Sequence, residues 1–134
     1  MQMQIDGRPM RLMVIDDEPT VGRRLKQVLS KSGFEVEVFT RPVAAVERMA
    51  EEPFDIVVTD FRMKEMNGMQ VLQKIRELSP RTKVIIITGY ARIETATKAF
   101  RAGGFDFIAK PFRLDELRQS IFRAARALEA ESAS

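Results

Sequence analysis

The hydrophobic residues of this chain fall into short runs that alternate with longer amphipathic stretches. The runs at 12–15, 56–59 and 84–87 are almost entirely apolar, and a further run follows at 105–109. Apolar runs of this length, each followed by a helix-length stretch, are typical of strands buried on both faces of a parallel sheet. The segment 34–39 instead alternates apolar and acidic residues, which indicates a strand with one face or one edge in water.

The pattern makes five strand–helix units in a row. We expect strands at 11–16, 34–39, 54–60, 83–88 and 105–109. We expect helices at about 19–32, 41–51, 66–78, 91–102 and 113–129. Such alternation predicts an α/β fold, a doubly wound sandwich with a five-stranded parallel sheet between two helical layers. The flavodoxin-like (βα)5 order 2-1-3-4-5 places the first strand beside the third.

The length of 134 residues predicts one domain with a core of its own. We expect that domain at 11–129, after a flexible lead-in at 1–10 and before a tail or linker start at 130–134. No apolar run is long enough to cross a bilayer, and the polar N-terminus lacks the apolar segment of a secretion signal. A cytoplasmic protein without a membrane partner is therefore expected.

The amino-acid composition excludes several classes of catalysis and of metal site. The chain contains no Cys and no His, which excludes thiol catalysis, histidine acid–base catalysis and the usual zinc and iron–sulfur sites. The net charge is +3, and the second half carries most of the basic residues. These are scattered instead of clustered with aromatic residues, and no DNA-binding motif is present, so direct nucleic-acid binding is not expected.

Polar residues end four of the predicted strands. Asp16 and Asp17 end the first, Asp60 the third, Thr88-Gly89 the fourth and Lys110-Pro111 the fifth. Ligands of open parallel sheets bind outside the carboxyl ends of the strands, so these side chains are expected to form one site.

Three carboxylates at one sheet edge need a compensating charge, because unit charges 4 Å apart repel by about 4 kcal/mol at an effective dielectric of 20. Lys110 and a divalent cation are the candidates, and oxygen-only ligands favour Mg²⁺, with Mn²⁺ possible. Alternatively, Asp16 or Asp17 caps the following helix.

A carboxylate beside a cation, with a lysine and a hydroxyl opposite, suits attack on a phosphoryl group and an aspartyl phosphate product. Asp60 is the expected nucleophile, although spacing alone does not settle that assignment.

These residues, in this order, resemble the receiver domain of bacterial two-component response regulators, the CheY-like family, over residues 10–128. The resemblance rests on Asp16-Asp17, Asp60, Thr88-Gly89, Phe107 and Lys110-Pro111. It implies that Asp60 accepts a phosphoryl group from a sensor histidine kinase or phosphotransfer protein. The protein is then no enzyme for other substrates and catalyses only its own phosphorylation and dephosphorylation.

The resemblance also assigns further roles. Asp16, Asp17, Asp60 and the backbone carbonyl of Arg62 would hold Mg²⁺, while Thr88, Gly89 and Lys110 would bind the phosphoryl group. Thr88 and Phe107 would form the conformational switch, and the Lys110–Pro111 peptide bond would be cis. Phe107 lacks the hydroxyl of the commoner Tyr, so we expect a larger inward population before phosphorylation.

The segments 60–63 and 103–112 look most like receivers of the NtrC and DctD type, which precede ATPase domains that activate transcription. Lys64 stands where many relatives have Pro, so it is a candidate for tuning the phosphoryl lifetime, together with Arg62 and Tyr90. Alternatively, these three side chains are ordinary surface residues without a functional role. The implied output face comprises the fourth helix, fifth strand and fifth helix, which would form a homodimer or bind an output domain or target.

Three other functions are compatible with parts of this pattern. A phosphohydrolase of the haloacid dehalogenase type needs a second acid two residues after its nucleophile, where this chain has Arg62. A flavodoxin needs a phosphate-binding loop after the first strand, where Asp16-Asp17-Glu18 would repel phosphate. The stronger alternative is a pseudo-receiver that is never phosphorylated and acts as a protein-interaction scaffold.

Overall fold

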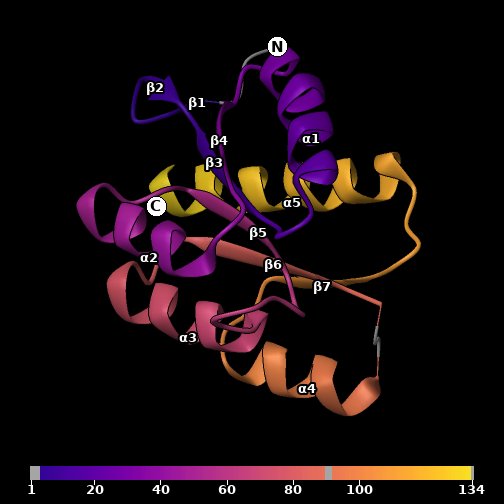
Figure 1. Cartoon of the computed structure of the whole chain (residues 1–134). Helices are drawn as coiled ribbons and strands as arrows, with labels where there is room; N and C mark the ends of the chain where they lie inside the picture. Colours follow the sequence, from indigo (N-terminus) through magenta and orange to yellow (C-terminus); the bar gives the residue numbers. More distant parts are fainter. Residues whose placement is uncertain (1–3, 90–91, 134) are drawn as a thin grey trace.

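A five-stranded parallel sheet forms the centre of the protein (Figure 1). In this computed structural model, which describes residues 4–89 and 92–133, the sheet order is β4-β3-β5-β6-β7. The strands are β3 (Arg11–Ile15), β4 (Glu35–Phe39), β5 (Ile56–Asp60), β6 (Lys83–Thr88) and β7 (Asp106–Ala109). Numbered among themselves, they follow the predicted order 2-1-3-4-5. The fold class and all five predicted strands are confirmed.

Five helices cover the two faces of the sheet. They are α1 (Pro19–Lys31), α2 (Pro42–Glu51), α3 (Gly68–Leu78), α4 (Ile93–Arg101) and α5 (Leu114–Ala133). One buried cluster joins α1 and α5 to the sheet, and the other joins α2, α3 and α4 to its opposite face (Figure 1). None of the helices in the described ranges is long and apolar enough to span a bilayer.

Local sequence signals explain where the helices begin and end. Pro19 and Pro42 occupy the first turns of α1 and α2, where a missing N–H removes no helical hydrogen bond. Asn67 and Gln70 form a reciprocal capping box at the start of α3. Gly33 and Gly103 adopt φ values of +91° and +98° just after α1 and α4, a backbone region that favours glycine. The alternating sequence of β4 separates its two faces, because Val36 and Val38 pack into the α1/α5 core cluster whereas Glu37 pairs with Arg11 and Arg48.

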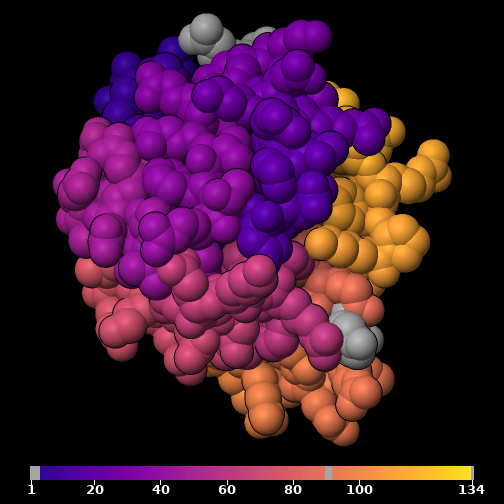
Figure 2. All heavy atoms as spheres, viewed as in Figure 1, coloured from indigo at the N-terminus to yellow at the C-terminus, as the bar shows by residue number. Residues whose placement is uncertain are grey.

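Residues 4–9 and 130–133 are more regular than the sequence predicts. Residues expected to form a flexible lead-in include a two-stranded antiparallel hairpin, β1 (Gln4–Ile5) and β2 (Arg8–Pro9). Its Ile5 is buried in the α1/α5 core cluster, and Asp6 accepts a hydrogen bond from Ser132 at 2.9 Å. Figure 2 shows the hairpin lying against the body of the domain. Helix α5 continues to Ala133, beyond the expected limit at 129, and the hairpin packs along it.

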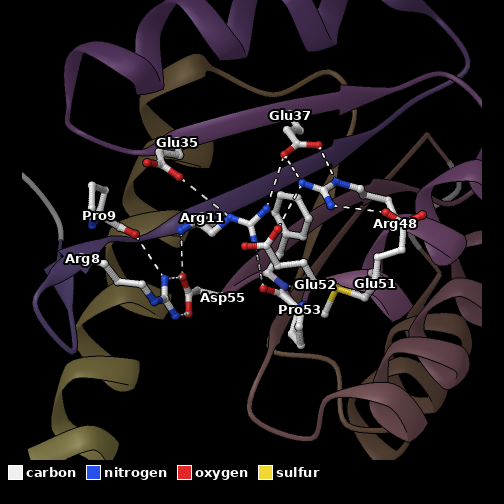
Figure 3. Close-up of polar contacts among 12 residues, drawn as sticks. Arg8, Pro9, Arg11, Glu35, Glu37, Arg48, Glu51, Glu52, Pro53 and Asp55 are labelled. Atoms are coloured by element: carbon white, nitrogen blue, oxygen red, sulfur yellow. Dashed lines mark hydrogen bonds and ion pairs between the residues drawn. The ribbon is translucent and has the colours of Figure 1, made fainter.

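A network of arginines and acids ties the hairpin to the base of the sheet, opposite the strand ends that carry the predicted site (Figure 3). The Asp55 carboxylate accepts two hydrogen bonds from Arg8, at 2.8 and 3.0 Å, and one from the backbone N–H of Arg11 at 2.7 Å. The Arg11 guanidinium is buried over the Phe54 ring, 4.1 Å from its centroid, and pairs with Glu37. These contacts fix the start of β3.

We predict that Asp55→Ala lowers the free energy of unfolding by about 2–3 kcal/mol, because it leaves a buried N–H and an arginine without their acceptor. Arg8→Ala should cost less than about 1 kcal/mol, since the Arg8 side chain is 44% exposed and a water-exposed ion pair contributes little. Urea denaturation of both variants measures the difference. Equal losses in the two variants would show that the Arg11 N–H contact is unimportant.

Candidate functional site

Three aspartates meet at the carboxyl edge of the sheet. Asp16 and Asp17 follow β3, and Asp60 ends the neighbouring strand β5. One carboxylate oxygen from each lies within 4.8 Å of the others. Parallel pairing of Ile15 with Thr59 puts both strand ends at the same level, which is why residues more than 40 positions apart converge.

The three carboxylates differ in their surroundings. Asp16 and Asp60 are buried, whereas Asp17 is exposed. Burial raises the pKa of Asp16, and the negative charges of Asp60 and Asp17 raise it further. The backbone N–H of Glu18 donates to Asp16 Oδ1 at 2.9 Å and opposes this rise. Burial is also the main reason that the pKa of Asp60 is raised.

Lys110 provides the compensating positive charge. Its Nζ lies 3.2 Å from Asp60 Oδ1 and 4.0 Å from Asp16 Oδ2. The ammonium lowers the pKa of Asp60 and so offsets part of the effect of burial. Lys110 follows β7, its backbone N–H donates to the Thr88 carbonyl at 2.7 Å, and its peptide bond to Pro111 is cis. The lysine is therefore held at the same sheet edge as the acids.

The remaining predicted residues lie on the strands and loops around this cluster. Thr88 is buried at the end of β6, Gly89 is exposed immediately after it, and Phe107 on β7 is half-buried against the α2–α4 core. Arg62 and Lys64 are exposed on the loop between β5 and α3. Tyr90, a candidate for lifetime tuning, lies outside the described residues.

A cavity of about 230 Å³ adjoins the exposed acid. Its lining comprises Asp17, Thr40, Arg41, Pro42, Lys64 and Glu65. Arg41 and Glu65 form an ion pair of 2.7 Å there, between the β4–α2 and β5–α3 loops. Sequence reasoning missed this pair. The two residues are 24 positions apart in loops of no regular pattern, and nothing in the sequence signals their contact.

Gly68 sets how closely α3 approaches the site. A Cβ at this position would lie 2.8 Å from the Asp60 carbonyl oxygen and 2.9 Å from the Phe61 Cα. The Gly68 N–H donates to the Phe61 carbonyl at 2.7 Å. A side chain would push the helix away from the end of β5, so glycine permits the tight return of the chain beside Asp60.

The donor set fits a hard divalent cation. Mg²⁺ binds oxygens at about 2.1 Å, so two opposite ligands stand about 4.2 Å apart. At most one pair among three ligands can be opposite, and adjacent ligands stand about 3.0 Å apart, so carboxylate oxygens within 4.8 Å of one another need to close by up to about 1.8 Å, or can bind through water. Asp16, Asp17 and Asp60 are therefore able to hold such an ion, with Lys110 beside them as a second positive group.

The raised pKa of Asp60 gives a pH-dependent prediction for the metal-free protein. A folded-state pKa above the unfolded value favours folding below the unfolded pKa, and this contribution is lost as pH rises through the folded pKa. With a chelator present at pH 7, the urea concentration at the midpoint of unfolding should therefore be higher for Asp60→Asn than for the wild type. The difference between the two midpoints should narrow as pH falls towards 4. A gap that stays constant with pH would contradict the raised pKa.

Comparisons with known proteins agree with this geometry. The sequence profile of the response regulator receiver domain family matches residues 12–122. Regulatory protein AtoC of Escherichia coli is 40% identical over 114 residues, covering 85% of this chain and 25% of that protein. The C4-dicarboxylate transport transcriptional regulatory protein DctD of Rhizobium meliloti is 36% identical over 113 residues, covering 84% and 25%. The chain thus spans about a quarter of the length of these curated relatives.

Solved structures show the same fold. A CheY-like response regulator receiver domain protein from Methanospirillum hungatei superposes with a TM-score of 0.86 at 29% identity, covering 91% of this chain and 98% of that one. The beryllofluoride-activated NtrC4 receiver domain dimer superposes with a TM-score of 0.83 at 30% identity, covering 88% and 98%. The fold, the acidic edge with its lysine and these matches lead to one conclusion. The chain belongs to the family of response regulator receiver domains, and it is similar to those of NtrC-type regulators.

Proposed function

We propose that the chain accepts a phosphoryl group on Asp60, in a divalent-cation-dependent reaction with the phosphohistidine of a sensor histidine kinase or phosphotransfer protein. The observation that carries this proposal is the meeting of three carboxylates with the Lys110 ammonium, 3.2 Å from Asp60. Membership of the receiver family supports it. Residues 11–129 would be the phosphorylated unit, acting in the cytoplasm.

The contacts of Asp60 suggest how its carboxylate reacts. The Lys110 ammonium and the Phe61 N–H both approach Oδ1, at 3.2 and 3.0 Å, which leaves Oδ2 for the new bond. As Oδ2 bonds to phosphorus, the P–N bond of the phosphohistidine breaks and the imidazole leaves with the electron pair. Lys110 would then neutralise an oxygen of the transferred group, and Thr88 with the Gly89 N–H would bind another.

Asp16, Asp17, Asp60 and the Arg62 carbonyl are the residues that would hold Mg²⁺, or Mn²⁺ in its place. The bound ion would supply positive charge against the transferring phosphoryl oxygens. Arg62 and Lys64 are exposed beside the site, where their side chains would tune how long the aspartyl phosphate survives. We expect the chain to catalyse only its own phosphorylation and dephosphorylation.

Phosphorylation would act on the rest of the molecule through Thr88 and Phe107. Movement of the Thr88 hydroxyl towards the phosphoryl group would favour the inward position of the Phe107 ring, a local change that biases a two-state element. We infer that α4, β7 and α5 form the responding face. Through this face the chain would control an output domain or target protein in transcription, as the name of the relative DctD suggests, without touching nucleic acid itself.

The same face carries the exposed apolar groups of α4. Ile93 is 85% exposed and Phe100 50% exposed. Ala125 of α5 is buried in the core and is not available for a dimer contact. A homodimer formed mainly by α4 is therefore our proposal, and the dimeric NtrC4 neighbour supports it.

Incubation with acetyl phosphate tests the proposed phosphorylation. Intact mass should show one phosphoryl adduct in the wild type with Mg²⁺, and none without Mg²⁺ or in Asp60→Asn. Asp115→Asn, which removes an exposed carboxylate on α5, should be modified like the wild type. A folded wild type that gains no adduct and binds no Mg²⁺ would refute phosphotransfer and favour the interaction scaffold.

Light scattering with beryllofluoride tests the dimer. The wild type should associate on addition of the phosphoryl mimic, and Phe100→Glu should weaken that association at least about tenfold, because it places a charge where apolar surface is buried. Leu78→Glu on α3 is the matched control, since Leu78 is also apolar and exposed but lies off the proposed face. Equal weakening by both substitutions would argue against an α4 interface.

A further inference from the structure

The loop between β5 and α3 carries the proposed metal-binding carbonyl of Arg62, and both of its ends are anchored. At its start, the Phe61 N–H donates to the Ile87 carbonyl at 2.8 Å. At its end, Asn67 caps α3, and the Gly68 N–H returns to the Phe61 carbonyl. The position of the stretch between these anchors decides where the Arg62 carbonyl points.

Glu65 provides a third anchor in the middle of the loop. Its carboxylate accepts a hydrogen bond from Arg41 at 2.7 Å, and this contact is the main reason that the pKa of Glu65 is lowered. Its backbone adopts φ +67°, the left-handed region that residues other than glycine rarely occupy. The side-chain contacts of Glu65 hold its backbone in a conformation that a glutamate rarely adopts by itself.

The partner of this anchor is the N-terminus of α2. Arg41 occupies the capping position, but its own side chain makes no cap, and Pro42 has no N–H. Val43 therefore provides the first backbone N–H of the helix proper, and a helix N-terminus attracts negative charge. The Glu65 carboxylate, paired with the Arg41 side chain, thus lies at this uncapped helix end although it comes from a different loop.

The anchored loop borders the metal-binding acids. Glu65, Arg41 and Lys64 line the same cavity as Asp17. The Arg41–Glu65 pair therefore joins the two loops that flank this acid. Releasing it would free from α2 the stretch between the Phe61 and Glu65 anchors, which contains the Arg62 carbonyl.

We propose that Glu65 is a positioning residue for the divalent cation: by pairing with Arg41 at the start of α2, it holds the Arg62 carbonyl in place relative to Asp17 and Asp60. The inference rests on the proposed function, since it concerns the same metal site. Glu65 itself does not touch the ion. Its removal should weaken metal binding without removing a ligand.

Calorimetric titration of the unphosphorylated protein with Mg²⁺ tests this role. Glu65→Gln and Glu65→Gly should each weaken the affinity by about tenfold, the lower end of effects seen when a residue supporting a metal ligand is lost. The glycine variant separates anchoring from backbone preference, because it accepts the left-handed conformation but has no carboxylate. Glu51→Gln is the matched control, since it breaks an Arg48 pair at the other end of α2 and should stay within about twofold of wild type.

The rate of phosphorylation by acetyl phosphate at increasing Mg²⁺ gives a second readout. In Glu65→Gln the half-saturating Mg²⁺ concentration should rise about tenfold while the maximal rate stays within about twofold of wild type, whereas general damage to the fold would lower the maximum. Unchanged Mg²⁺ affinity in both Glu65 variants, or wild-type affinity in Glu65→Gly alone, would overturn the positioning role only. A wild type that binds no Mg²⁺ would overturn the proposed function and this inference with it.

Discussion

The contact between Lys110 and Asp60 is the interaction on which the site depends. Two carboxylates separated by about 4 Å repel by about 4 kcal/mol at an effective dielectric of 20, and here three lie within 4.8 Å. One ammonium, 3.2 Å from Asp60 and 4.0 Å from Asp16, offsets part of this repulsion. The remaining negative charge is what makes the site attractive to a divalent cation. If neighbouring groups fully compensated the three carboxylates, the site would attract a divalent cation less strongly.

The carboxylates at the two ends of the sheet differ in how fully their charge is compensated. At the base, the Asp55 carboxylate is matched by arginine and backbone donors, so that charge stabilises the start of β3 and secures the hairpin. At the carboxyl edge the acids outnumber their partner, and burial raises the pKa of Asp16 and Asp60. The base holds the strands in register, and the rigid sheet then keeps the under-compensated acids together.

The sequence predicted the elements that depend on periodicity and strand ends. Apolar runs located the strands, and the parallel topology brought Asp16, Asp17 and Asp60 together because their strands are neighbours. The hairpin at 4–9 was missed, since two-residue strands have no period to detect and their stability comes from packing on α5. The Glu65 anchor was missed for a related reason: a contact between two irregular loops leaves no pattern in either.

The central claim is that Asp60, and neither Asp16 nor Asp17, carries the phosphoryl group. Borohydride reduction of the protein after phosphorylation converts an aspartyl phosphate to homoserine, which peptide mass spectrometry locates. We predict homoserine at position 60 alone, because Asp60 is the acid that Lys110 contacts most closely. Homoserine at position 16 or 17, with Asp60 unchanged, would contradict it.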